Sequence, residues 1–214
     1  MDVLIIIIGI TGFILAVILH EIAHGYVADK LGDPTARLMG RLSLNPIKHI
    51  DILGSVILPL TLVILRSPFI FGWAKPVPIE PYNLRNPKKD LALISLAGPL
   101  TNLAFAAVLS IFLRILISIF PNFDVVNLFF YLIQFNVVLA VFNLLPISPL
   151  DGSKILTGLL PEKKAYAFNN FMGRFGMILI FLLIFPSFGG SSLLGIITGP
   201  IINFLLKIFI PGYI

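Results

Sequence analysis

The chain has 214 residues, of which 58% are hydrophobic and only 12% are charged. A soluble globular domain carries about 25% charged residues, so this composition excludes an ordinary soluble domain and a disordered chain. It favours a protein with several membrane spans. The absence of cysteine excludes disulfides and thiolate metal sites. The formal net charge of +5 fits the basic cytoplasmic loops of a membrane protein, and we expect no nucleic-acid partner.

The first third of the chain contains one long and one short apolar run. Residues 3–19 are apolar, and a helical pattern continues to Leu31. Because no basic residue precedes this run and no small-residue cleavage site follows it, we expect a retained span and not a signal peptide. The second run, residues 52–65, has only 14 residues and contains Pro59. This predicts a re-entrant or tilted segment.

Residues 69–81 have a different pattern, because Gly72 and three prolines interrupt the apolar residues. The pattern predicts an extended segment or β hairpin. Apolar runs at 91–120, 125–145, 171–185 and 193–210 predict further helices. We therefore expect an all-α polytopic membrane protein with about five or six transmembrane helices and a small hairpin near residues 69–81. Residues 1–214 read as a single domain, with a core at about 1–160 and two further spans at about 165–210.

The distribution of basic residues predicts an orientation. Nine lysines and arginines lie between residues 30 and 89 and three more between 154 and 164, whereas the connections at 121–124 and 186–192 carry none. If residues 52–65 do not cross, every basic loop falls on one side of the membrane. The positive-inside rule then favours five crossings plus one re-entrant segment, with the N-terminus outside and the C-terminus in the cytoplasm. A short tilted crossing is the alternative.

Three polar residues at the end of the first apolar run carry the clearest chemical signal. His20 and His24 lie four residues apart, so on a helix their imidazoles face the same way and can bind one metal ion. Glu21 lies beside them and is placed to act on water at that ion. This is the His-Glu-x-x-His arrangement of zinc metalloproteases. The alternative, that the histidines only pack the helix end, leaves the cost of burying ionisable groups in a span unexplained.

A catalytic zinc site needs a third protein ligand and an open position. Asp151 is the best candidate, because the spans ending at His24 and at Asp151 run in the same direction and bring both to a similar depth near the cytoplasmic face. Pro146, Pro149 and Gly152 break the helix there and can turn the carboxylate inward. His49, in a basic loop, is the rival ligand. We expect His49 instead to order that loop, and Asp51 to cap the following segment.

These residues resemble the site-2 protease family of intramembrane zinc metalloproteases. The resemblance rests on two motifs, His20-Glu21-x-x-His24 and Asn143-x-x-Pro146-x-x-x-Leu150-Asp151-Gly152. It is supported by Gly98-Pro99-x-x-Asn102 and by Gly72-Trp73-Ala74-Lys75-Pro76-Val77-Pro78. Together these stretches extend over about two thirds of the chain. We expect no room for the peptide-binding or nucleotide-sensing domains that some members carry.

The resemblance implies an intramembrane protease domain with one Zn²⁺ per chain, held by His20, His24 and Asp151, and with Glu21 as catalytic base. The substrate would be a transmembrane segment of another membrane protein. We expect a multi-pass protein of the cell membrane, with its active site toward the cytoplasmic face. No oligomeric state is predicted.

Other residues are candidates for substrate contact. Asn143 or Asn102 could donate a hydrogen bond to the substrate backbone or the developing oxyanion, although interhelical hydrogen bonding is an alternative for both. An extended edge could pair with an unwound substrate by strand addition. The backbone positions concerned are Gly72, Trp73, Ala74, Lys75 and Val77, because Pro76 and Pro78 cannot donate. An inert surface hairpin is the alternative.

Two rival functions fit part of the pattern. A metal-dependent transporter also uses intramembrane His and Asp, but it needs no Glu beside its ligands, and no paired half-helices are evident. A catalytically inactive relative would bind membrane segments without cutting them. Because Glu21 and all three ligands are present, the sequence favours the hydrolase.

Overall fold

The computed structural model describes residues 3–65, 72–119, 123–184, 192–210 and 212. Its long helices are α1 (Val3–Leu31), α4 (Pro87–Ile119), α5 (Phe123–Asn143) and α7 (Glu162–Ile184). The shorter elements are α2 (Thr35–Leu38), η1 (Pro46–His49), the π-helix η2 (Ile52–Ile57), α3 (Leu58–Ile64), η3 (Pro81–Asn83), α6 (Asp151–Leu159) and α8 (Leu193–Phe209). The predicted all-helical architecture is confirmed over the described residues.

Four helices are long and apolar enough to cross a membrane: α1 from Ile5, α4, α5 from Asp124, and α7. The expected count of five or six is therefore not confirmed, since Ile52–Ile64 and α8 are shorter apolar helices. Fewer than half of the residues in the most apolar stretch of each long helix are buried inside the protein, and in α1 only 17% are. Helices that are apolar on their outer faces are suited to a lipid environment.

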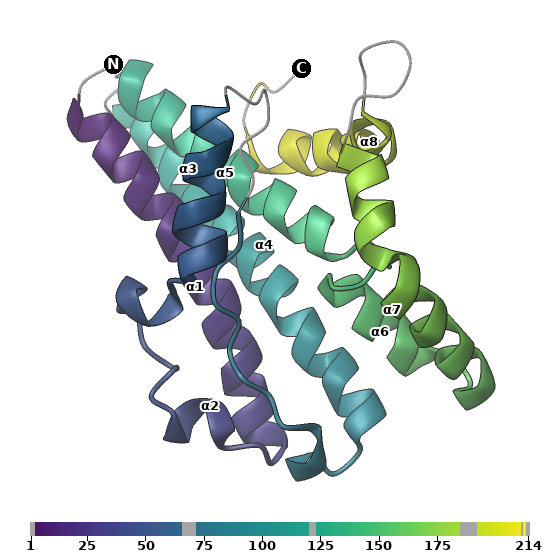
Figure 1. Ribbon diagram of the computed structural model, residues 1–214. Helices are drawn as coiled ribbons and strands as arrows, with labels where there is room; N and C mark the ends of the chain where they lie inside the picture. Colours follow the sequence, from purple (N-terminus) through teal and green to yellow (C-terminus); the bar gives the residue numbers. More distant parts are fainter. Residues whose placement is uncertain (1–2, 66–71, 120–122, 185–191, 211, 213–214) are drawn as a thin grey trace.

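The core of the bundle lies between α4, α5 and α8 (Figure 1). Its fully buried side chains include Leu113, Ile133, Val137 and Leu206. A smaller cluster, formed by Ala28, Ile94 and Leu84, packs the end of α1 against the start of α4 and the chain before it. These two clusters fix α4 against both of its neighbours, and α4 thereby becomes the central helix of the site.

The position of α8 corrects the expected topology. Its 17 residues lie across one end of the bundle (Figure 1). Near its C-terminal end, the carbonyl groups of Ile208 and Phe209 accept hydrogen bonds from Arg114 and Ser110 of the distal half of α4. The helix therefore ends on the half of the bundle away from the residues that follow α1. A C-terminus on the same side as those residues, as the basic loops predicted, does not agree with this packing.

The described chain after the short apolar segment lies beside the start of that segment. The backbone N–H of Trp73 donates to Gly54 O (3.2 Å), and that of Lys75 donates to His49 O (2.8 Å). At Gly54 an added Cβ would lie 2.3 Å from the indole of Trp73, so only glycine allows the returning chain to pack this closely. Asp51 accepts from the N–H of Gly54 (2.7 Å) and caps η2 as predicted. The return supports the re-entrant interpretation.

The β hairpin predicted near residues 69–81 is not confirmed. Residues 69–71 lie outside the described residues, and residues 72–80 are extended without a strand ladder in the described chain. The backbone of this segment bonds to the loop before η2 and to side chains instead, because Pro76 and Pro78 cannot donate to a ladder. We call residues 72–77 the strap.

Candidate active site

His20 and His24 lie one helical turn apart on α1 and face the interior. They are 5% and 7% exposed, and their ring centroids are 4.6 Å apart with the rings almost perpendicular. The four-residue spacing predicted this common direction. Both rings point toward α4 and α6, away from the outer face of the bundle.

Asp151 reaches the histidines from a break between two helices. The chain leaves α5 at Asn143, turns through residues 144–150 and restarts as α6 at Asp151. At Gly152 an added Cβ would lie 2.2 Å from Leu144 O, so glycine is needed for α6 to start against this turn. The predicted break and the predicted inward carboxylate are both found.

The three side chains converge on one point. Asp151 Oδ2 lies 3.1 Å from His20 Nε2 and 3.2 Å from His24 Nε2. One ligand atom from each of the three residues lies within 4.8 Å of the others, and all three residues are buried. His49, the rival ligand, is not part of this group: its Nε2 donates to Ser43 O (2.8 Å) in its own loop.

The hydrogen bonds on the far side of each ring define which nitrogen faces this point. His20 Nδ1 donates to Asn102 Oδ1 (2.6 Å), and His24 Nδ1 donates to Ile94 O (2.7 Å). In a neutral imidazole the other nitrogen is then unprotonated. Two lone pairs and a carboxylate oxygen face one another, an arrangement that repels unless a cation lies between them. The donor set therefore fits a metal ion, and the outer hydrogen bonds are those that orient metal-bound histidines.

Gly98 of α4 lets both imidazoles pack directly against the helix backbone. An added Cβ at this position would lie 2.5 Å from His24 Nε2 and 2.6 Å from His20 Nε2. Gly98 belongs to one of the motifs that support the family resemblance, and its missing side chain borders the proposed ligand atoms themselves.

Asn102 lies behind His20, in a buried amide network. Its Nδ2 donates to Ala16 O (3.2 Å) and to Asn136 Oδ1 (3.1 Å), and Asn136 donates to Leu132 O (2.8 Å). Both asparagines are 0% exposed. Asn102 thus makes the interhelical contact that was its alternative interpretation. Asn136 was missed, although an amide within an apolar span is a recognisable signal.

Asn143 does not join this network. Its amide donates to Leu139 O (2.9 Å), one turn earlier in the same helix. It is part-buried at the end of α5. Its predicted contact with substrate remains a prediction.

Glu21 is part-buried on α1 and accepts a hydrogen bond at Oε2 from the backbone N–H of Val77 (2.8 Å). The strap therefore runs past the predicted base. The strap's own polar groups are already used in part: Trp73, Lys75 and Val77 each donate within the chain. Among the five positions predicted for strand pairing, Gly72 and Ala74 have backbone groups with no partner in the described residues.

The sequence matches the family model described as Peptidase family M50 over residues 113–183, a stretch that includes Asp151. It is 36% identical over 198 residues to the Bacillus subtilis protein named "Putative zinc metalloprotease YwhC". The alignment covers 89% of this chain and 85% of that protein.

More distant relatives include the Mycolicibacterium smegmatis protein "Putative zinc metalloprotease Rip2", 30% identical over 83% of this chain and 67% of that protein. The Methanocaldococcus jannaschii protein "Zinc metalloprotease MJ0392" is 28% identical over 71% of this chain and 34% of that protein. No solved structure matches the sequence significantly. With YwhC matched over most of both lengths, the chain belongs to peptidase family M50, the site-2 family of zinc metalloproteases.

Proposed function

We propose that this protein is an intramembrane zinc metalloprotease that hydrolyses peptide bonds within or near transmembrane segments of other membrane proteins. The observation that carries the proposal is the convergence of His20, His24 and Asp151 on one point inside a bundle of apolar helices. Relatives named as putative zinc metalloproteases, matched over 89% and 83% of this chain, support the same chemistry.

The proposed zinc ligands are Nε2 of His20, Nε2 of His24 and a carboxylate oxygen of Asp151. A zinc ion held there would supply Lewis acidity, polarising a peptide carbonyl and lowering the pKa of water. The protein contributes the orientation of the ligands: the carbonyl of Ile94 and the side chain of Asn102 hold each imidazole with its lone pair inward. The missing side chain of Gly98 lets both imidazoles pack close to α4.

Glu21 is the proposed catalytic base. Its carboxylate takes a proton from the attacking water and passes it to the nitrogen of the leaving amine. The hydrogen bond from Val77 N–H to Oε2 holds one oxygen and leaves the other to accept that proton. Asn143 remains a candidate for a hydrogen bond to the developing oxyanion. Asn102, also considered for that role, donates both of its N–H groups within the protein, which favours a positioning role behind His20.

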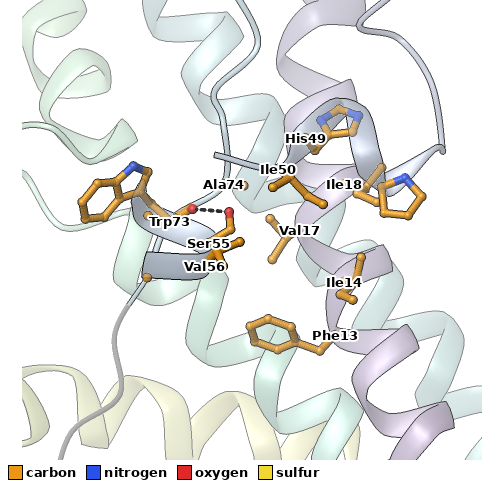
Figure 2. A pocket seen from close by; sticks show the side chains of 13 residues that line it. Phe13, Ile14, Val17, Ile18, His49, Ile50, Ser55, Val56, Trp73 and Ala74 are labelled. Atoms are coloured by element: carbon orange, nitrogen blue, oxygen red, sulfur yellow. Dashed lines mark hydrogen bonds between the residues drawn. The ribbon is translucent and has the colours of Figure 1, made fainter. Parts of the chain in front are cut away.

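An apolar cavity beside α1, about one helical turn before Glu21, suits an apolar substrate. A cavity of about 510 Å³ lies between α1, the loop before η2, η2 itself and the strap, and most of its lining is apolar. Figure 2 shows Phe13, Ile14 and Val17 on one side and Trp73 and Val56 on the other. Val17 lies one helical turn before Glu21 and thus on the same face of α1. Side chains of an unwound transmembrane segment fit this cavity.

Backbone pairing with substrate is proposed at Gly72 and Ala74. A peptide bond inside a helix is shielded by its own hydrogen bonds, so the substrate must unwind before cleavage. The unpaired N–H and C=O of Ala74 offer an unwound segment one antiparallel or parallel pairing site beside the cavity. Two positions are proposed instead of the five predicted from the sequence, because the backbone N–H groups of Trp73, Lys75 and Val77 are already used to hold the strap in place.

We place the protein in the cell membrane as a multi-pass protein, with the metal centre toward the cytoplasmic face. Support comes from the basic residues that follow α1 and precede α4, since basic loops lie in the cytoplasm. The histidines lie near that end of α1. A transmembrane segment of another protein and the lipid bilayer are the proposed partners.

The test compares zinc-loaded wild type with Glu21→Gln on a model transmembrane substrate in detergent. Cleavage by the wild type, lost in the variant while zinc stays bound, is the expected result. Equal cleavage by both proteins would reject the role of Glu21. An inactive relative would cleave in neither case and still bind the segment. A transporter would instead move zinc across proteoliposomes, with a rate that Glu21→Gln leaves unchanged.

A further inference from the structure

Arg41 is buried in the loop after α2, although nothing in the proposed reaction uses it. Its side chain is 7% exposed. Nη2 donates to the carbonyl oxygens of Lys75 (2.8 Å) and Pro76 (3.2 Å), and Nε is buried without a partner. Among the described residues no carboxylate forms an ion pair with it. Burying a charge without an opposite charge is costly, so this arginine needs a compensating role.

One peptide group connects Arg41 to the proposed catalytic base. The carbonyl of Pro76 accepts from the guanidinium, and the N–H of the same peptide group, on Val77, donates to Glu21 Oε2 (2.8 Å). This peptide bond is trans, so its C=O and N–H point in opposite directions. A cation at the carbonyl and an anion at the N–H polarise the amide in the same sense, and each hydrogen bond strengthens the other.

The neighbouring residues hold this peptide group in one position. Pro76 has a fixed φ and no N–H of its own, and Lys75 N–H is tied to His49 O (2.8 Å). The Val77 side chain is 6% exposed. It packs where α1 has no side chain, because an added Cβ at Gly25 would lie 2.8 Å from its Cγ1. The Pro76–Val77 peptide group, which forms a bridge between Arg41 and Glu21, is thus held in place on both sides.

We propose that Arg41 is a positioning residue that orients the Glu21 carboxylate through the Pro76–Val77 peptide group. The inference rests on the proposed function, in which Glu21 moves the proton. Since Glu21 acts in the chemical step, loss of Arg41 lowers kcat and leaves KM nearly unchanged. Since Arg41 contacts none of the three metal ligands, zinc content is also unchanged.

The first experiment measures kcat, KM and zinc content for Arg41→Met and Arg41→Lys with a model transmembrane substrate. Charge-assisted hydrogen bonds of this kind predict a fall in kcat of about 10- to 100-fold for Arg41→Met, with partial rescue by Arg41→Lys. Arg37→Met is the matched control: Arg37 has a side chain 59% exposed and paired with Asp29, so its loss of charge leaves kcat at the wild-type value. A wild-type kcat in Arg41→Met would overturn the inference, as would a raised KM alone.

The second experiment breaks the bridge from its other end. Replacing the amide before residue 77 by an ester removes the N–H and keeps both Arg41 and the valine side chain. The ester is expected to lower kcat as Arg41→Met does, and the two changes together are expected to lower it no further, because both break one bridge. If the two changes together lower kcat by the product of their separate effects, Arg41 and the Val77 N–H act independently, and the inference is overturned. Should Arg41→Met fail to fold, Arg41→Lys takes its place, measured alone and combined with the ester. An active Glu21→Gln would refute the proposed function instead.

Discussion

Gly98→Ala is expected to damage the metal centre by adding one methyl group. The new Cβ would lie 2.5 Å from His24 Nε2 and 2.6 Å from His20 Nε2, whereas carbon atoms in contact prefer about 3.5 Å or more. The imidazoles or α4 must therefore retreat by about 1 Å. Zinc–nitrogen distances of about 2.0–2.1 Å tolerate about 0.2 Å of change. The required shift is several times larger than that tolerance.

The expected magnitude is a loss of zinc affinity of at least about 100-fold, because displacing both imidazoles exceeds the loss of one orienting hydrogen bond. Affinity is measured on purified protein by competition with a chromophoric chelator, and zinc content by elemental analysis. Circular dichroism and thermal melting establish that the variant is folded. Cleavage of a model substrate should fall together with bound zinc.

Gly173→Ala is the matched control. Gly173 is also helical, in α7, and an added Cβ there would meet no atom within 4 Å. Alanine favours helix over glycine by up to about 1 kcal/mol, so this variant should keep its zinc and melt no lower than the wild type. A folded Gly98→Ala that binds one zinc ion with wild-type affinity would refute the geometry proposed for the centre.

Two further predictions concern buried polar groups. Asn102→Leu keeps the side-chain volume but removes the oxygen that accepts a hydrogen bond from His20. Zinc affinity should therefore fall about 10- to 100-fold in the chelator assay. Asp33 is fully buried; burial alone would raise the pKa of its carboxyl, but hydrogen bonds from Asn83, Thr35 and backbone N–H groups outweigh burial and lower that pKa. The stability it contributes is therefore present above the unfolded pKa of about 4 and is lost as pH falls through the lower folded value. Asp33→Asn should cost about 1–3 kcal/mol near neutral pH and flatten the acid side of the stability curve, whereas Asp29→Asn, in a surface pair, should change little.

The grouping of the three proposed metal ligands was predictable because two of them depend on local geometry. Helical spacing alone puts His20 and His24 on one face. Asp151 is distant in sequence, but two constraints located it: the direction of its span and the prolines that break the helix before it. Both constraints are readable without coordinates, and the structure brings the carboxylate to 3.1 and 3.2 Å from the two imidazoles.

The number of crossings was less predictable. Hydropathy measures the preference of a side chain for an apolar medium, and the interior of a helical bundle satisfies that preference as lipid does. Leu206 is 0% exposed because α8 packs it against α4 and α5. Residues 193–210 therefore have the composition of a span without needing to be one. Length was the better indicator, since 17 residues are fewer than a crossing usually needs.

The strap could not be predicted as it is, because its partners are carbonyls and side chains far away in the sequence. Alternating prolines indicate an extended chain but do not indicate what it pairs with. In the structure, Lys75 and Trp73 pair with the loop before η2 and with η2 itself, neither of which is a strand. A hairpin prediction assumes a neighbouring strand, and this segment uses the backbone of a π-helix instead.

Arg41 shows why counting charges gives only part of the information that basic residues hold. As one of nine basic residues between positions 30 and 89, it contributes to the orientation signal in the same way as an exposed lysine. Yet it is buried, and its guanidinium bonds to the Pro76 carbonyl at the far end of the peptide that holds Glu21. The insertion signal requires only a positive charge at this position, and lysine would supply it. A guanidinium that reaches two adjacent carbonyls is a stricter requirement. Arg41→Lys therefore separates the two roles: the orientation of the protein should survive the change, and full catalytic rate should not.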